Sequence, residues 1–215
     1  MEGDNILEER KKKLASFFKN KYSWISYLVL AFIVYLSVKI RTRNLPLLRD
    51  ITTGSWTLGP DLDPFLFLRW SKYIVENGSL FAIDTMRYVP LGFNTKYELL
   101  LHPYMMAWFH NIAKMFGSTS VEQSAVIYPV LMFAFTVIAF FLFVRVLFID
   151  KLGELKANIT ALISSLFLTI APALLPRTIA GIPEKESAAF LFMFLSFYFF
   201  LSAWRQKTAK KQISF

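Results

Sequence analysis

The chain has 215 residues, of which 55% are hydrophobic, 17% aromatic and 18% charged, with a formal net charge of +9 and no cysteine. The absence of cysteine excludes disulfide bonds and metal sites with thiolate ligands. The basic residues gather at both ends of the chain beside uncharged runs, which is typical of cytoplasmic segments next to membrane spans and excludes a nucleic-acid partner.

Uncharged runs predict four transmembrane helices in an all-α, polytopic membrane protein. Each run has about the length that an α-helix needs to cross a hydrocarbon core of roughly 30 Å. A basic segment precedes the first run, as in a secretory signal, but no small-residue cleavage pattern follows it, which favours an uncleaved anchor. The predicted spans are residues 22–39, 123–145, 157–176 and 187–204.

The distribution of lysine and arginine predicts the orientation of these spans. Short cytoplasmic segments carry an excess of basic residues. We therefore expect an integral protein of the cell membrane with a cytoplasmic N-terminus. The predicted cytoplasmic segments are residues 1–21, 146–156 and 205–215, and the predicted external segments are residues 40–122 and 177–186.

The first external segment is too long to be structureless, so it should contain helices. Asp63-Pro64 predicts a helix start with Asp63 as the N-cap, and Gly78 lies where a C-terminal cap would end that helix. A second, amphipathic helix is predicted from Pro103 to about Phe116. Its expected apolar stripe is Met105, Met106, Phe109, Ile112 and Ala113. We expect both helices to lie along the membrane surface.

Three acidic sites fall on the predicted external side: Asp61-Leu62-Asp63, Asp84 and Glu184-Lys185-Glu186. In extended backbone, residues i and i+2 project to the same side, so each pair could converge on one hard cation such as Mg²⁺ or Mn²⁺. A structural role is the alternative. Asp63 could cap a helix, and the two glutamates could stabilise the start of the fourth span through the helix dipole.

Other polar residues near these sites also have two possible roles. His102 is either a helix cap or an auxiliary metal ligand, and Arg177 either binds an anion or extends to the membrane interface. Asn77-Gly78-Ser79 and Asn158-Ile159-Thr160 are glycosylation sequons, of which only Asn77 lies on the predicted external side.

Five motifs resemble those of a known family in their order and placement. They are Asp63-Pro64-Phe65-Leu66-Phe67-Leu68-Arg69, Tyr88-Val89-Pro90-Leu91-Gly92, His102-Pro103, Arg177-Thr178-Ile179-Ala180-Gly181 and Glu184-Lys185-Glu186. Together they resemble the N-terminal part of the catalytic subunit of oligosaccharyltransferase, particularly its archaeal forms, within the GT-C class of membrane glycosyltransferases. The similarity runs through most of residues 23–204.

The resemblance implies transfer of a glycan from a lipid phosphate or pyrophosphate carrier to the asparagine of an N-x-S/T sequon. It also implies a divalent cation, Mn²⁺ or Mg²⁺, between the two acidic motifs. Asp63, Glu184 and Glu186 would be the catalytic metal ligands, with His102 as a further ligand, and Arg69 and Arg177 would bind substrate. The implied partners are a lipid-linked oligosaccharide, an acceptor protein and membrane lipids.

The chain also departs from this family. Glu184 stands where the family has Asp, which lengthens the side chain by one methylene. Family members continue through further spans, a loop with another essential Glu, and a soluble domain whose Trp-Trp-Asp element reads the sequon. This chain ends at Phe215 and contains no Trp-Trp pair. We therefore expect the 215 residues alone to be inactive without the remaining part or another subunit.

Two alternatives to this function stay open. One is another GT-C glycosyltransferase that moves a sugar from a lipid phosphate to a different acceptor. The other is a non-enzymatic four-span scaffold whose acidic residues cap helices. Transport is disfavoured, because transporters place polar groups near the bilayer midplane and the predicted spans are almost free of ionisable residues.

Overall fold

The computed structural model describes residues 21–205, with side chains from Trp24 onward. The segments 1–20 and 206–215, most of the predicted cytoplasmic ends, lie outside the described residues. The described chain forms two compact units. We call residues 21–37, 136–170 and 193–205 the helical unit, and residues 38–135 and 171–192 the loop unit.

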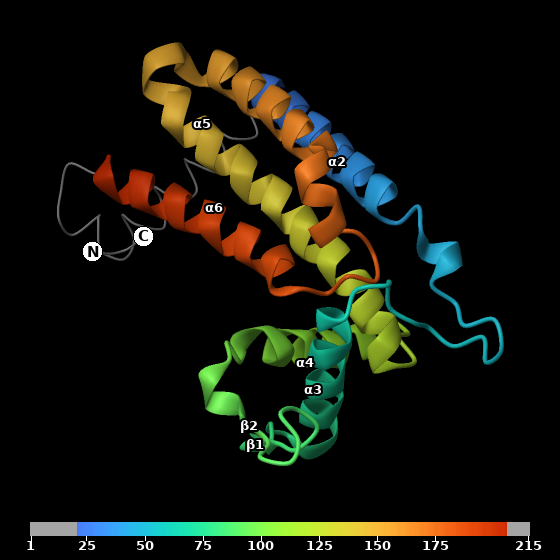
Figure 1. The fold of residues 1–215 in the computed structure, drawn as a ribbon. Helices are drawn as coiled ribbons and strands as arrows, with labels where there is room; N and C mark the ends of the chain where they lie inside the picture. Colours follow the sequence, from blue (N-terminus) through green and yellow to red (C-terminus); the bar gives the residue numbers. More distant parts are fainter. Residues whose placement is uncertain (1–20, 206–215) are drawn as a thin grey trace, which may run out of the picture. The chain divides into compact units, whose positions relative to one another are not determined.

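The structure is mostly helical, as predicted (Figure 1). Its α-helices are α2 (Lys21–Arg41), α3 (Asp63–Asn77), α4 (Leu101–Lys114), α5 (Val121–Ile170) and α6 (Lys185–Trp204). Three short 3-10 helices are η1 (Leu45–Leu47), η2 (Thr95–Tyr97) and η3 (Pro172–Arg177). The strands β1 (Ile83–Asp84) and β2 (Phe93–Asn94) form a two-stranded antiparallel sheet, which the all-α prediction did not include.

Three helical stretches among the described residues are long and apolar enough to cross a membrane: Trp24–Leu47, Val121–Ile170 and Lys185–Trp204. The second and third predicted spans both fall in α5, which runs for 50 residues and contains one non-helical residue, Gly153, at φ 75° and ψ 168°. The count of four spans therefore stays a prediction.

The third predicted span extends too far in the sequence. It was expected to continue to residue 176, but α5 ends at Ile170 and the chain continues as η3. Pro172 and Pro176 account for this ending, because proline lacks the backbone N–H that an α-helix needs and its ring clashes with the preceding turn.

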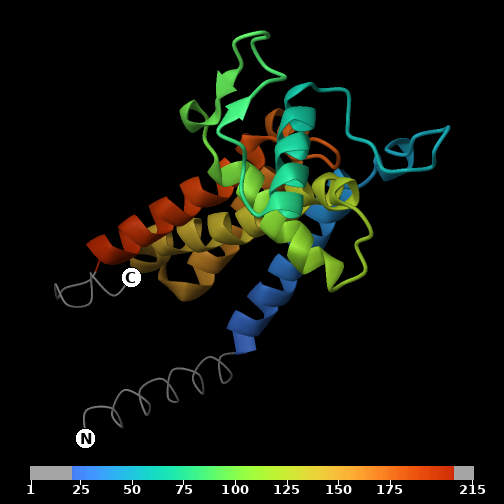
Figure 2. The same ribbon diagram turned by 90° about the horizontal axis from the view of Figure 1, so that it is seen from below.

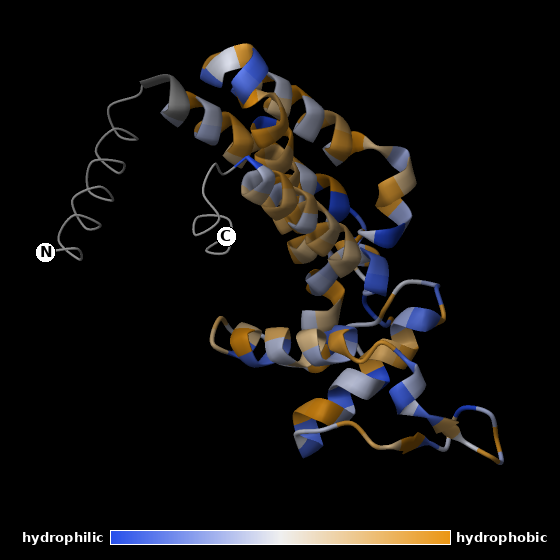
Figure 3. Ribbon diagram, turned by 90° about the vertical axis from the view of Figure 1, so that its left-hand side faces the viewer, coloured by the Kyte–Doolittle hydropathy of each residue, from blue (hydrophilic) through white to orange (hydrophobic). Residues whose placement is uncertain are grey.

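Contacts between phenylalanine rings and a hydrogen bond from Arg145 stabilise the helical unit. Phe140 and Phe143 of α5 contact Phe194 and Phe197 of α6, with ring centroids of Phe140 and Phe194 4.7 Å apart. Where α5 folds back, Arg145 Nε donates to Asn158 Oδ1 at 2.7 Å. Hydrophobic residues dominate these helices, and hydrophilic residues mark the fold-back (Figure 3).

The helix α3 begins and ends as its sequence predicts, except for the cap. Asp63 is its first residue, Pro64 follows, and Gly78 ends it in the left-handed conformation with its N–H bonded to Ile74 O. Leu62 occupies the N-cap position, so the prediction that Asp63 caps the helix is wrong. As the first helical residue, Asp63 instead interacts favourably with the helix dipole.

The helix α4 packs against α3 (Figure 2). The predicted apolar stripe is partly confirmed, because Met106 is buried and Met105 and Phe109 pack against the core. Ile112, also predicted to be in the stripe, is 56% exposed. The stripe omitted two histidines, which an apolar pattern excludes but which are buried with hydrogen-bond partners: Pro183 O for His102 and Ser124 Oγ for His110.

Backbone hydrogen bonds tie the segment before α6 to three other parts of the loop unit. Ala180 N donates to Arg41 O, Gly181 N to Val126 O, and Gly59 N to Gly181 O, at 2.8–2.9 Å. The two glycines are needed for this approach. A Cβ on Gly59 would lie 2.5 Å from Ile182 Cδ1, and one on Gly181 would lie 2.7 Å from Leu48 Cδ1. Gly181 also has φ +85°, which favours glycine.

Gly181→Ala should destabilise the protein by about 2–3 kcal/mol, because it adds backbone strain and forces a Cβ against the buried Leu48 side chain. The measurement is the midpoint of thermal unfolding in detergent. Gly54→Ala is the matched control, since Gly54 also has positive φ but nothing lies within 4 Å of an added Cβ. Equal shifts for both variants would contradict a role for close packing at Gly181.

Candidate functional site

The acidic residue Glu184 lies at the centre of the candidate site, immediately before α6. The residue is 2% exposed. The segment from Arg177 to Glu184 turns back on itself, so that Arg177 Nη1 donates to Glu184 Oε2. The same nitrogen lies 3.5 Å from Asp61 Oδ2. One guanidinium therefore joins two carboxylates that are far apart in the sequence, and we call Asp61, Arg177 and Glu184 the Arg177 cluster.

Burial raises the pKa of Glu184 to about 7. This pKa already includes the effect of the Arg177 guanidinium, which lowers it, and of the Asp61 and Glu186 carboxylates, which raise it. The hydrogen bond to Glu184 in turn raises the pKa of Arg177. The second carboxylate oxygen, Glu184 Oε1, is buried and has no hydrogen-bond partner among the described residues.

His102 contacts the backbone at Pro183, the residue before Glu184. Its Nε2 is 3.0 Å from Pro183 O, and its ring contacts the rings of Phe67 and Tyr128. Because this position is inside α4, the reading of His102 as a helix cap is wrong. Burial lowers the pKa of His102 to about 4, so the imidazole is neutral at pH 7.

The hydrogen bond to a carbonyl identifies the tautomer of His102. A carbonyl accepts, so Nε2 carries the proton and Nδ1 presents a lone pair. Nδ1 is buried and has no partner in the described part of the chain. Glu184 Oε1 and His102 Nδ1 are thus two buried acceptor atoms without a donor among residues 24–205.

Asp63 and Glu186 both lie in the first turn of a helix, α3 and α6 respectively, and both are exposed. Within residues 21–205, no group of three or more His, Asp or Glu side chains lies close enough together to hold a metal ion. The structure therefore brings Glu184 to Arg177 and Asp61 but does not gather the full predicted ligand set. The metal site stays a prediction.

Lys185, which lies between Glu184 and Glu186 in the sequence, pairs with the carboxylate of Glu98. Lys185 Nζ donates to Glu98 Oε1 at 2.9 Å. Arg87 Nη1 lies 3.9 Å from the other oxygen of Glu98. Burial alone would raise the pKa of Glu98, but these two cations and the Leu99 N–H lower it.

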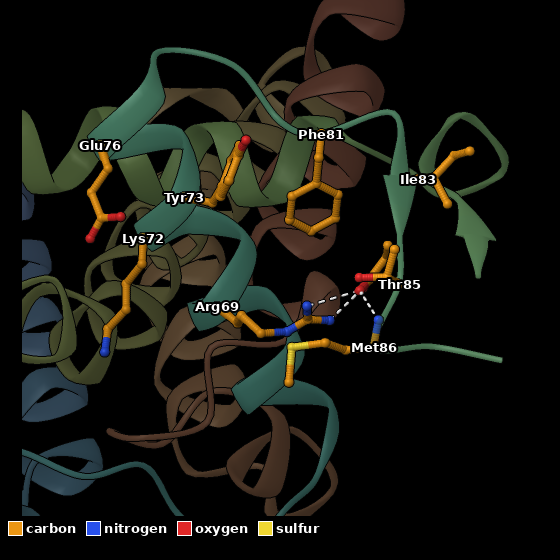
Figure 4. Close-up of a pocket in the computed structure, with 9 residues that line it drawn as sticks. Arg69, Lys72, Tyr73, Glu76, Phe81, Ile83, Thr85 and Met86 are labelled. Atoms are coloured by element: carbon orange, nitrogen blue, oxygen red, sulfur yellow. Dashed lines mark hydrogen bonds and ion pairs between the residues drawn. The ribbon is translucent and has the colours of Figure 1, made fainter. Parts of the chain in front are cut away.

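Arg69 and the buried Asp84 form an ion pair at the wall of an open cavity of about 350 Å³ (Figure 4). Asp84, 1% exposed, accepts from both terminal nitrogens of Arg69, from Trp70 Nε1 and from the Met86 N–H. Burial alone would raise the pKa of Asp84, but these hydrogen bonds lower it. The predicted acidic site at Asp84 therefore anchors the β1–β2 hairpin to α3. Substrate binding by Arg69 stays a prediction.

An apolar cavity of about 680 Å³ opens beside the Arg177 cluster. Leucine, isoleucine and proline side chains line it, and Asp61 and Asn44 are its polar residues. Asp61 is a predicted candidate through its pair with Asp63, but its contact with Arg177 was not predicted, because no family motif includes Asp61. The available signal was the Gly59-Pro60 pair just before it, which is typical of a close turn.

The comparison with known proteins places these residues in a family. The family model described as oligosaccharyl transferase STT3, N-terminal, matches residues 21–215. No curated protein matches the chain.

Two solved structures have a similar fold. One is the Archaeoglobus fulgidus oligosaccharyltransferase complex with Zn and sulfate, at 21% identity and a TM-score of 0.66, covering 85% of this chain. The other is oligosaccharyltransferase AglB from Archaeoglobus fulgidus in complex with an inhibitory peptide and a dolichol-phosphate, at 21% identity and a TM-score of 0.68, covering 91% of this chain. The chain spans 22% of the length of each. By its family match over residues 21–215, the chain belongs to the oligosaccharyl transferase STT3 family, as an N-terminal part.

Proposed function

We propose that this chain is the N-terminal portion of a metal-dependent oligosaccharyltransferase. The enzyme transfers a glycan from a lipid phosphate or pyrophosphate to the asparagine of an N-x-S/T sequon, with its site on the external face of the membrane. The observation that carries the proposal, within a member of this family, is the buried Glu184 with one oxygen on Arg177 and the other without a donor. A buried acceptor of this kind calls for a cation or a proton.

We propose Mn²⁺ or Mg²⁺ as the cation, and the described residues supply only part of its ligand set. Glu184 Oε1 and His102 Nδ1 are both buried without a donor among the described residues, and carboxylate oxygen with neutral imidazole is a donor set that Mn²⁺ accepts. Asp63 and Glu186 would complete the set from the exposed first turns of α3 and α6. When bound, the cation would neutralise negative charge that develops on the leaving phosphate. The solved relative that is described with Zn supports a metal in the family.

Arg177 is the residue of this chain best suited to hold the phosphate. Its side chain is 46% exposed, so one part of the guanidinium can face solvent while Nη1 stays on Glu184. A planar guanidinium has several donors and binds phosphate oxygens in a bidentate manner. Arg69 is less suited, because Asp84 occupies both of its terminal nitrogens.

The cavity beside Asp61 supports binding of a lipid carrier at the same place. Its lining is mainly apolar, and it reaches Pro176, the residue before Arg177. An isoprenoid or other lipid chain in this cavity would place its phosphate next to the Arg177 cluster. The solved relative that is described with a dolichol-phosphate agrees with this kind of donor.

The transfer itself moves one glycosyl group. The amide nitrogen of the acceptor asparagine bonds to the anomeric carbon, the bond from that carbon to the phosphate oxygen breaks, and the lipid phosphate leaves with the electron pair while the amide loses a proton. Arg177 would orient the phosphate for this departure and offset its growing charge.

In the full-length protein, Asp63→Ala and Glu186→Ala should each weaken Mn²⁺ binding roughly 10–100-fold and reduce transfer to a sequon peptide, because each removes one expected carboxylate ligand. Mn²⁺ affinity in detergent and transfer from a lipid-linked donor are the measurements. Glu76→Ala is the control, since Glu76 is an exposed carboxylate on the wall of the other cavity. Unchanged Mn²⁺ affinity in both ligand variants would contradict the metal site. Transfer only to an acceptor other than asparagine would favour the alternative GT-C enzyme.

Mn²⁺ affinity should rise with pH up to about 7 and then level off. Glu184 has a pKa of about 7 and must lose its proton to bind a cation, so protons compete with the metal below that pH. The neutral His102, with a pKa of about 4, adds no dependence in this range. The measurement is Mn²⁺ affinity in detergent from about pH 5.5 to 8.5. Glu184→Gln should bind more weakly and lose this dependence. A flat wild-type profile would contradict the role of Glu184.

A further inference from the structure

The sequon Asn77-Gly78-Ser79 lies at an exposed helix end in the loop unit. Asn77 is the last residue of α3, and all three residues of the sequon are exposed. The Asn77 amide donates from Nδ2 to Tyr73 O at 3.0 Å, in an exposed position. Water can replace such a bond at little cost, so the amide nitrogen is available to an enzyme.

The backbone around Asn77 can open without disturbing the core. Gly78 ends the helix at φ +79°, and one N–H bond from Gly78 to Ile74 O closes the last turn. Helix termini open at low free energy. The chain beyond the sequon is held independently, because Leu80 N donates to Tyr104 Oη at 3.1 Å and Phe81 packs on Tyr73. Opening is therefore confined to the sequon and the last helical turn.

The chain contains a second sequon in the opposite environment. Asn158 lies inside α5 and is 3% exposed. Its Oδ1 accepts from Arg145 Nε at 2.7 Å, and Thr160 Oγ1 of the same sequon donates to Lys156 O. To reach an active site, Asn158 would have to leave a continuous helix and break a charge-assisted bond. The two sequons therefore share the motif and differ in access.

We propose that Asn77 of this protein is itself N-glycosylated. This inference rests on the proposed function, which supplies the activity, and on the predicted external position of residues 40–122. In the reaction, Asn77 Nδ2 bonds to the anomeric carbon of a lipid-phosphate-linked glycan, the bond from that carbon to the phosphate oxygen breaks, the lipid phosphate leaves with the electron pair, and the amide loses one proton. Asn158 stays unmodified.

The test is mass spectrometry of tryptic peptides from the full-length protein, purified from its own membranes. Cleavage after Lys72 and Arg87 isolates residues 73–87 with Asn77, and cleavage after Lys156 and Arg177 isolates residues 157–177 with Asn158. The first peptide should carry at least one sugar and the second none. Ser79→Ala should remove the sugar from Asn77, because it destroys the sequon and leaves Asn77 and the helix end in place.

A separate assay distinguishes failure of this inference from failure of the proposed function. The same membranes are given a synthetic sequon peptide, and Ser79→Ala should transfer glycan to it as the wild type does. A glycosylated peptide with a bare Asn77 would overturn the inference and leave the function standing. A sugar on Asn158, or a sugar on Asn77 that survives Ser79→Ala, would also overturn the inference. No transfer to the peptide would overturn the proposed function.

Discussion

The loop unit depends on the contact between two glycines. Gly59 and Gly181 approach closely enough for a backbone hydrogen bond of 2.8 Å, and a methyl group on either would overlap a neighbouring side chain. This contact joins the segment before α3 to the segment before α6. Each segment carries an acidic motif, two to five residues further on in the sequence. Backbone packing brings Asp61 close to Arg177 and Glu184, and charge attraction then adds to this contact.

Burial then sets the electrostatics of the site. A glutamate in water is ionised at neutral pH, but Glu184 lies where water cannot reach and where Asp61 and Glu186 oppose a further negative charge. Arg177 donates a hydrogen bond to one oxygen of the Glu184 carboxylate, Oε2. The same burial keeps His102 neutral and leaves its Nδ1 lone pair available. Among the described residues, the site therefore holds two buried acceptor atoms without donors, which is more typical of a binding site than of a structural ion pair.

Local patterns in the sequence predicted the helices well, because proline, glycine and uncharged runs act over a few residues. The start of α3 at Asp63, its end before Gly78, and α4 within two residues at each end were all predicted correctly. The two buried histidines of α4 and the contact of Asp61 with Arg177 were not, because they depend on contacts between residues apart in the sequence: His102 with Pro183, His110 with Ser124, and Asp61 with Arg177. The family motifs supplied candidate residues, but they did not predict that Asp84 would occupy Arg69.

The pairing of Lys185 with Glu98 has a consequence for the field at the start of α6. In the sequence, Lys185 lies between Glu184 and Glu186, and its positive charge would offset half of their combined negative charge. In space, its ammonium belongs to Glu98, which also lies near Arg87. The positive charge is thus held beside Glu98, whereas Glu186 stays exposed to solvent. The three acidic and basic side chains of the motif therefore act in three different surroundings: Glu184 on Arg177, Lys185 on Glu98, and Glu186 in solvent.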